Sequence, residues 1–109
     1  MPLDLIEFPA DDLDRARRFW ETLLGLSLDG RSEGEGDGLQ THRGPPALGL
    51  HDRGAGPGDR FSLPYFGVSE LTRALELVVE LGGDVVHPGD RWAICRDSEG
   101  SPFGLTAAE

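Results

Sequence analysis

In two parts of the chain, a short apolar segment typical of a strand is followed directly by the apolar spacing of an amphipathic helix. The first of these parts lies at the start of the sequence. Residues 3–8 predict a short strand that ends at Pro9. Residues 10–26 predict a helix that one of its two leading aspartates, Asp11 or Asp12, can cap and that Gly25 can end. Its expected buried stripe is Leu13, Ala16, Trp20, Leu23 and Leu24.

The second half of the chain repeats this order. Residues 61–68 predict a strand, and residues 69–83 predict a helix capped by Ser69 and ended by Gly82. The expected buried stripe of this helix is Leu71, Ala74, Leu75 and Val78. Three more short strands are expected at residues 84–88, 91–97 and 101–107.

The region between the two halves has a different composition. Residues 30–58 hold nine of the sixteen glycines, and two short apolar pieces at residues 39–42 and 47–51 predict strands separated by the turn RGPP. The acidic, glycine-rich segment RSEGEGDG (residues 31–38) predicts a mobile hairpin loop. Its glycines do not have a phosphate-binding spacing and no helix follows them, so a nucleotide-binding loop is not expected.

A shift of 58 residues superimposes the two halves. It places Leu5 on Leu63, Phe8 on Phe66 and Leu13 on Leu71, among other matches. The pattern predicts an α+β fold in which one domain (residues 1–109) contains two βαβββ modules, at about 1–58 and 59–109. The alternative is that two amphipathic helices look alike by chance.

Charge and cysteine content narrow the expected partners. The 109 residues carry a net charge of −10, which disfavours nucleic acid and anionic lipid surfaces but would attract a cationic ligand. The one cysteine excludes a disulfide within the chain. The acidic start has no basic flank followed by a long apolar run, so neither a secretory signal nor a membrane span is expected, and a cytoplasmic location is predicted.

The order of these segments resembles the vicinal oxygen chelate superfamily, which includes glyoxalase I, extradiol dioxygenases and the fosfomycin- and bleomycin-resistance proteins. The resemblance rests on IEFPADDLDRARRFWETLLGL, ELTRALELVVELGGDVVHP and WAICRDSEGSPFGL, and it is weak only across residues 30–58. It implies two modules with curved sheets, helices on the outer face, and a binding cavity inside the curve. Many relatives dimerise, so a homodimer is expected.

The resemblance also implies where metal ligands would stand. Metal-dependent relatives use His and Glu on cavity-facing strands, and three of those positions here hold Leu5, Leu63 and Gly104. The remaining position falls near Gly49 or His51, and the sequence does not decide between them. One histidine is insufficient to hold a divalent ion, so no metal cofactor is expected. A rearranged metal site made of Glu7, His42 and His51 is the alternative.

Strand alternation assigns the remaining faces. Residues expected under the helices are Ile6, Phe8, Phe66, Val68, Ala93, Cys95, Phe103 and Leu105. The residues expected to line a ligand site are Glu7, His51, Phe61, Tyr65, Trp92 and Arg96. Each also has a plainer interpretation: Glu7 as a solvated strand end, Arg96 as a hairpin ion-pair partner, Tyr65 and Trp92 as dimer-interface residues.

These patterns favour a metal-independent protein that binds a cationic or aromatic small molecule, as bleomycin-resistance proteins sequester a drug. An antibiotic or an aromatic metabolite is the expected ligand class. Two alternatives stay open: a lyase or dioxygenase of the same superfamily with displaced metal ligands, and a non-catalytic interaction protein. Catalysis is therefore left undecided, with a binding role favoured.

Overall fold

The computed structural model describes residues 3–31, 37–42, 46–56 and 59–107, and within them the chain forms two helices and eight strands. These elements belong to two compact units. The N-terminal module is Leu5–Ser62, and the C-terminal module runs from Leu63 and also takes in Leu3 and Asp4. In the latter module Thr106 Oγ1 donates a hydrogen bond of 3.0 Å to Asp4 Oδ2. Neither helix is long and apolar enough to cross a membrane.

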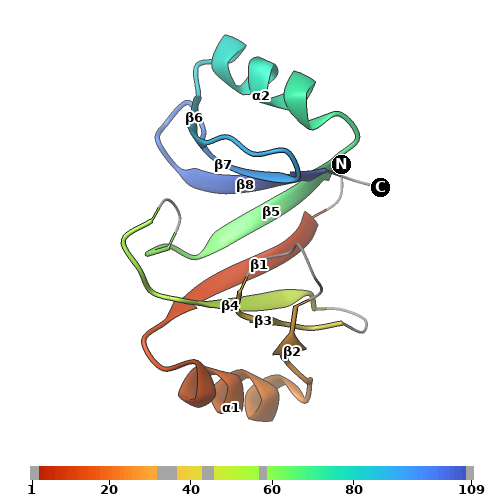
Figure 1. Ribbon diagram of the computed structural model, residues 1–109, viewed down its shortest axis with the longest axis vertical. Coiled ribbons are helices and arrows are strands. Elements are labelled where there is room, and N and C mark those ends of the chain that lie inside the picture. Colours follow the sequence, from red (N-terminus) through yellow and green to blue (C-terminus); the bar gives the residue numbers. More distant parts are fainter. Residues whose placement is uncertain (1–2, 32–36, 43–45, 57–58, 108–109) are drawn as a thin grey trace. The chain divides into compact units, whose positions relative to one another are not determined.

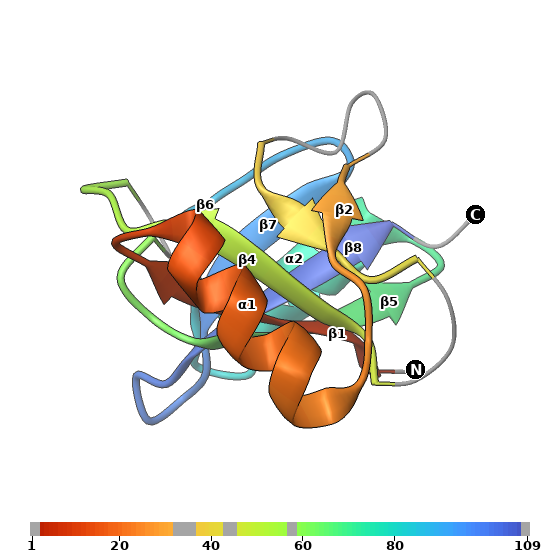
Figure 2. The same ribbon diagram turned by 90° about the horizontal axis from the view of Figure 1, so that it is seen from below.

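The N-terminal module has the order strand, helix and three strands (Figure 1). Its elements are β1 (Leu3–Ala10), α1 (Leu13–Leu24), β2 (Asp29–Gly30), β3 (Leu39–Gln40) and β4 (Leu48–Asp52). The strands are ordered β2-β3-β4-β1, with β1 and β4 parallel and the other pairs antiparallel. Figure 2 shows α1 crossing β4 on one face of this sheet.

Helix α1 begins and ends where its sequence predicts. The Asp12 side chain accepts a hydrogen bond of 3.0 Å from the Arg15 N–H, and Gly25 ends the helix in the left-handed region at φ 66°. Under the helix, Leu28, Leu48 and Leu50 are buried, and the residues packed around them include Ile6, Phe8, Leu13, Ala16 and Trp20.

The predicted buried stripe of α1 is wrong at its C-terminal end. Leu23 and Leu24 are 62% and 45% exposed, and neither packs in the core beneath the helix. Helical spacing identifies which face of a helix is apolar, but it does not tell how far along the helix the neighbouring core extends.

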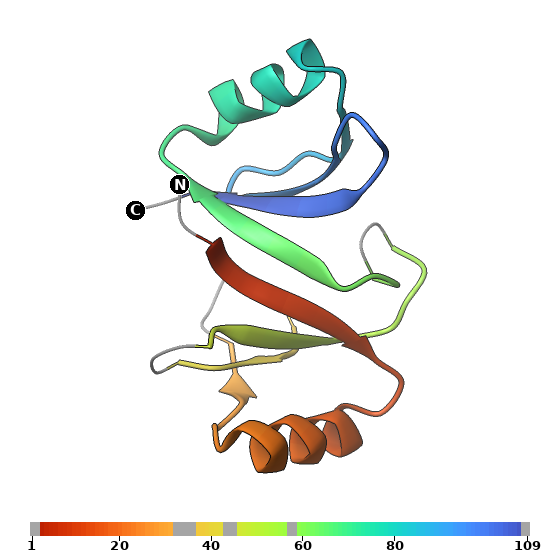
Figure 3. The same cartoon turned by 180° about the vertical axis from the view of Figure 1, so that it is seen from behind.

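The C-terminal module has the same order of elements and the same pairing. Its elements are β5 (Leu63–Val68), α2 (Leu71–Glu80), β6 (Asp84–His87), β7 (Trp92–Arg96) and β8 (Pro102–Ala107). The strands are ordered β5-β8-β7-β6, with the first and last strands of the module parallel and the others antiparallel. Helix α2 lies on one face of this sheet (Figure 3). The α+β class with two βαβββ modules is thus confirmed.

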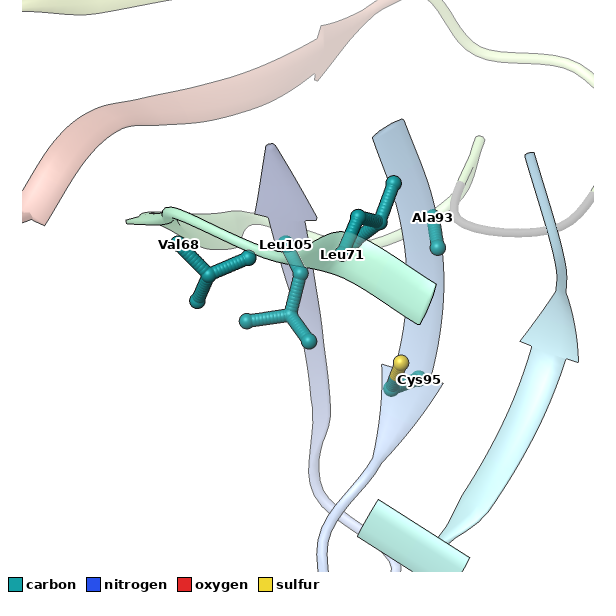
Figure 4. Packing of buried hydrophobic residues seen from close by; sticks show 5 residues of the cluster. All are labelled: Val68, Leu71, Ala93, Cys95 and Leu105. Atoms are coloured by element: carbon teal, nitrogen blue, oxygen red, sulfur yellow. The ribbon is translucent and has the colours of Figure 1, made fainter. Parts of the chain in front are cut away.

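The core of the C-terminal module lies between α2 and its sheet. Its buried residues are Val68, Leu71, Ala93, Cys95 and Leu105 (Figure 4). The partly buried residues around them include the rest of the predicted α2 stripe, namely Ala74, Leu75 and Val78. The predicted face of α2 is therefore confirmed along its whole length.

The predicted ends of α2 are confirmed on one side only. Residue Glu70, and not Ser69, occupies the N-cap position, and it makes no side-chain capping bond. At the other end Gly82 has φ 94° and its N–H donates to Val79 O, while Gly83 N–H donates to Val78 O over 2.8 Å. This pair of bonds is the Schellman motif, which satisfies the last carbonyls of a helix.

Several strand boundaries differ from those predicted. Strand β1 continues through Pro9 to Ala10, because it pairs in parallel with β4 and Pro9 lies opposite His51 there. Strand β5 begins at Leu63, so Phe61 lies outside any strand and is 52% exposed. Strand β2 was not predicted.

In the glycine-rich region both predicted strands are present as β3 and β4, with shifted ends. Residues 32–36 of the predicted mobile loop and residues 43–45 of the predicted turn lie outside the described residues.

The left-handed glycine at the end of α2 yields a stability prediction. A Cβ at Gly82 would meet nothing closer than 3.9 Å, so Gly82→Ala introduces backbone strain without a clash and should cost about 1–2 kcal/mol. Gly30→Ala is the matched control, since Gly30 has open space and no positive φ. Urea denaturation measures the free energy of unfolding of both variants. If Gly82→Ala were as stable as Gly30→Ala, the positive φ at position 82 would not be what requires a glycine there.

Candidate functional site

One face of the N-terminal sheet is turned away from α1. Ile6 and Phe8 pack in the core beneath the helix, so the alternating residues Leu5 and Glu7 lie on the other face of β1, as predicted. Glu7 is the buried charged residue of the described chain, at 8% exposure.

Strand β4 contributes to the same face. Leu48 and Leu50 pack beneath α1, which places Gly49 and His51 on the face of Glu7. The parallel register sets Gly49 directly opposite Glu7.

Glu7 is held between two basic side chains. Its Oε1 lies 2.7 Å from His51 Nδ1, and its Oε2 lies 3.0 Å from Arg31 Nη2. The three side chains are only 10%, 13% and 9% exposed, in the order Glu7, His51, Arg31. Burying one carboxylate is costly unless it is paired, and here both of its oxygens have a basic partner.

His51 is bonded through both ring nitrogens. Nδ1 faces the Glu7 carboxylate, and Nε2 lies 3.1 Å from the carbonyl oxygen of Asp59. Both partners are acceptors when Glu7 is ionised, so the imidazolium form of His51, which donates from both nitrogens, satisfies the two bonds together.

The electrostatics agree with an ion pair. Burial acts to raise the pKa of Glu7, but the His51 hydrogen bond and the Arg31 charge outweigh it, so the pKa lies below its usual value of 4.5. The hydrogen bond to Glu7 raises the pKa of His51 above 6.5, against the opposing effect of burial. The charge of Asp59 adds to the increase in the His51 pKa.

Arg31 lies where a side chain at position 49 would stand. A Cβ built on Gly49 would come within 2.7 Å of Arg31 Nη2, and within 2.9 Å of both Glu7 Cγ and Leu5 Cδ1. The glycine therefore leaves the space in which the guanidinium and the carboxylate meet.

The C-terminal module has a similar arrangement on its own face. Phe66 and Val68 pack toward α2, which turns Leu63 and Tyr65 to the opposite face of β5, as predicted. Tyr65 lies opposite Gly104 of β8, and its ring fills the space that a Cβ on Gly104 would need.

Strand β7 also follows the predicted alternation. Ala93 and Cys95 are buried beneath α2, so Trp92, Ile94 and Arg96 lie on the other face. Phe103 and Leu105 of β8 pack on the helix side, again as predicted.

The two modules are equivalent at these positions. The shift of 58 residues that places Leu5 on Leu63 also places Glu7 on Tyr65, and the glycines opposite them are Gly49 and Gly104. The structure thereby decides between the two candidates for the fourth position: Gly49, not His51, is the counterpart of Gly104.

The family model of the glyoxalase-like domain matches residues 5–106. The chain belongs to the glyoxalase-like domain family. It is thus a member of the vicinal oxygen chelate superfamily, and the resemblance inferred from its segments is confirmed. No curated protein matches the sequence.

Solved structures share the fold of this glyoxalase-like domain at low sequence identity. Hypothetical protein BH1468 from Bacillus halodurans C-125 is 17% identical, with a TM-score of 0.74 over 99% of this chain and 94% of that one. Methylmalonyl-CoA epimerase from Streptomyces coelicolor is 15% identical, with a TM-score of 0.70 over 99% and 94% of the two chains. Both similarities concern the fold.

The residues of this glyoxalase-like domain do not fit the metal site of its metal-dependent relatives. The positions at which the resemblance implies metal ligands hold Leu5, Gly49, Leu63 and Gly104, none of which has a donor side chain. A guanidinium lies over Gly49, where it would repel a cation, and an aromatic ring covers Gly104.

The rearranged metal site is not formed either. Nowhere in the described part of the chain do three His, Cys, Asp or Glu side chains gather as metal ligands. His42 instead places Nε2 2.9 Å from the carbonyl oxygen of Gly30, while His51 is bonded to Glu7.

The structure brings some of the predicted ligand-site residues together. Glu7 and His51 are bonded, and both lie in the N-terminal module. In the C-terminal module Trp92 is 38% exposed and stacks on His87 at 5.1 Å between ring centroids. Arg96 is exposed at the end of β7.

The plainer interpretation of Arg96 is not supported. Its two expected partners at the hairpin are Asp97 and Glu99. The Asp97 carboxylate accepts the backbone N–H groups of Glu99 and Ser101 at 2.8 and 2.9 Å, and the Glu99 carboxylate accepts the Ser98 hydroxyl at 3.2 Å. Among the described ion pairs none involves Arg96.

Sequence reasoning missed Arg31. It was assigned to the glycine-rich loop, although its side chain is among the least exposed charged groups of the N-terminal module. One feature of the sequence points to Arg31: it is the single basic residue in the acidic segment RSEGEGDG, where a partner for a buried carboxylate could be sought.

The Glu7–His51 pair predicts a pH window of stability. The lowered Glu7 pKa stabilises the fold above pH 4.5, and this contribution is lost as the pH falls through the folded-state value. The raised His51 pKa stabilises it below pH 6.5, and this contribution is lost as the pH rises through the folded-state value. The pair therefore contributes fully between pH 4.5 and 6.5.

Glu7→Gln should remove this window and destabilise the fold by about 3 kcal/mol near its middle, because two buried cations lose their carboxylate. Glu76→Gln is the control: Glu76 pairs with Arg73 at an exposed site, so its loss should change stability by about 0.5 kcal/mol or less. Urea denaturation between about pH 4 and 8 measures both. If the free energy of unfolding of Glu7→Gln changed with pH in the same way as that of the wild type, the assignment of this pH dependence to the Glu7–His51 pair would be contradicted.

Proposed function

We propose that this glyoxalase-like domain binds a small molecule without a metal ion. The observation that carries the proposal is the set of side chains at the four positions where metal-dependent relatives carry ligands: two leucines and two glycines. The space over both glycines is filled by other side chains, so a cation would have to displace Arg31 in one module and Tyr65 in the other.

The chemistry of the two sheet faces supports a binding role. The N-terminal face offers the paired polar groups Glu7, Arg31 and His51. The C-terminal face, by itself, offers Tyr65, Ile94 and Trp92 together with Arg96. Apolar and aromatic walls with a few oriented polar groups are typical of small-molecule sites. The bonds to both nitrogens of His51 disfavour its use as a general base, which supports binding rather than proton transfer.

We extend the proposal to the partners that the sequence predicts. The ligand is aromatic or cationic, with an antibiotic or aromatic metabolite as the expected class, and the protein acts as a cytoplasmic homodimer. The net charge of −10 supports a cationic ligand, and the family resemblance supports the homodimer.

Metal analysis tests the first part of the proposal. Protein purified without added metal should contain nickel, zinc, iron and manganese well below one equivalent, and adding each ion should leave the melting temperature unchanged. Stoichiometric metal that a chelator removes together with stability would favour the displaced-ligand enzyme instead.

Tryptophan fluorescence tests the second part. Trp92 lies on the proposed binding face. Trp20, a residue of α1, is partly buried and packs toward the core on the opposite face of the N-terminal sheet, stacked on Phe8 at 4.8 Å between ring centroids. Titration with a panel of aromatic and cationic molecules should quench emission in the wild type and in Trp20→Phe, but not in Trp92→Phe. Unchanged fluorescence across the panel would favour the interaction protein.

A further inference from the structure

We propose that His51 is a pH-sensitive latch for residues 59–62: its protonated ring holds this segment against the N-terminal sheet, and its neutral ring releases it. Residues 59–62 are the last of the N-terminal module and lead directly into β5. The inference goes beyond small-molecule binding and does not depend on it.

The first observation is that the His51 ring lies between two hydrogen-bond acceptors. Its Nδ1 is 2.7 Å from Glu7 Oε1, and its Nε2 is 3.1 Å from the carbonyl oxygen of Asp59. The imidazolium ring donates from both nitrogens, whereas a neutral ring has one N–H and one lone pair. Loss of one proton therefore removes one of the two bonds and sets a lone pair against an acceptor oxygen.

The bond to Asp59 is the one that the neutral ring loses. A carboxylate is a stronger acceptor than a carbonyl, and the contact with Glu7 is the shorter of the two. The Glu7 carboxylate is also buried and held by Arg31 at 3.0 Å, whereas Asp59 belongs to no helix or strand. The remaining proton thus stays on Nδ1, and Nε2 repels the Asp59 carbonyl.

The second observation is that the other hydrogen bonds of this segment are local. The Asp59 carboxylate accepts the N–H of Gly56 at 2.9 Å. The Arg60 guanidinium donates to the carbonyl oxygen of Gly54 at 3.3 Å. Among the described hydrogen bonds, the one from His51 alone joins the segment to a strand of the N-terminal sheet. Its loss therefore frees the segment from the sheet.

The charged groups around His51 determine the direction of the switch. Glu7 on β1 and the Asp59 carboxylate favour the imidazolium, and Arg31 contacts the other oxygen of the same Glu7 carboxylate. The hydrogen bond to Glu7 raises the pKa of His51 above 6.5, against the effect of burial. Release therefore occurs as the pH rises above 6.5, and acid keeps the ring protonated and the segment held.

Nuclear magnetic resonance follows both ends of the latch. The ring carbon signals of His51 report its protonation, and the carbonyl carbon signal of Asp59 reports the hydrogen bond that this oxygen accepts. As the pH rises from about 5 to 9, both should change with one midpoint, which lies above 6.5. His42, bonded to the carbonyl oxygen of Gly30, is the internal control, because its titration should leave Asp59 unchanged.

Cleavage by chymotrypsin after Phe61, which is 52% exposed, measures the release. Between about pH 6 and 9, the cleavage rate of the wild type relative to His51→Gln should rise about tenfold, the restraint expected from a bond with a charged donor. The glutamine amide donates to Asp59 at every pH and does not titrate. The ratio to this variant removes the pH dependence of the protease itself.

Two further variants test the direction of the effect. His51→Asn has a shorter side chain that donates on the Glu7 side alone, so cleavage after Phe61 should be fast at every pH. Glu7→Gln removes the bond that raises the His51 pKa, so the change at the Asp59 carbonyl should move to lower pH. Dispersed amide spectra establish that each variant is folded.

Three results would overturn the inference. The first is an Asp59 carbonyl signal that stays constant while His51 titrates, and the second is the same pH dependence of cleavage in the wild type and His51→Gln. The third is an equal rise of cleavage after Trp92, since this would indicate general unfolding. None of them bears on metal content or ligand quenching, which test the proposed function separately.

Discussion

Both modules depend on one close contact, in which a large side chain of the first strand lies against a glycine of the last strand. Glu7 meets Gly49 in one module, and Tyr65 meets Gly104 in the other. The parallel pairing of these strands sets the residues directly opposite each other. A residue with a side chain at either glycine would have to displace its partner, so the glycine determines what the face of the sheet can hold.

The two contacts have different chemical consequences. In the C-terminal module an aromatic ring fills the space, and the side chains around it on β5 and β7 are mostly apolar or aromatic, with Arg96 at the end of β7. In the N-terminal module the guanidinium of Arg31 and the side chains of Glu7 and Leu5 fill the corresponding space. Burial of the Glu7 carboxylate requires compensating charges, which Arg31 and His51 supply. The same backbone arrangement thus holds an aromatic ring in one module and a buried charged cluster in the other. Relatives that place a metal ion at these positions need donor side chains where this chain has Leu5, Leu63 and two glycines.

The elements and their faces could be predicted from sequence because both follow from short-range periodicity. The α2 stripe and the alternation of β1, β5 and β7 involve residues within about a dozen positions of one another, and the core of each module confirms them. The predictions that are wrong concern the ends of helices and strands. Leu23 and Leu24 remain exposed because the extent of the core beneath α1 is a tertiary property, and Phe61 lies outside β5 because pairing with β8 determines where that strand begins.

The sequence by itself determined the two βαβββ modules, the family, and the absence of donor side chains at Leu5, Leu63 and Gly104. Only the tertiary structure decided that Gly49 is the fourth equivalent position, because the register between β1 and β4 joins segments about forty residues apart and no local pattern encodes it. It also decided that Arg31 joins Glu7 and His51. Three segments supply these residues, and they meet only because the paired strands bring β1 beside β4 and the side chain of Arg31, directly after β2, reaches over Gly49.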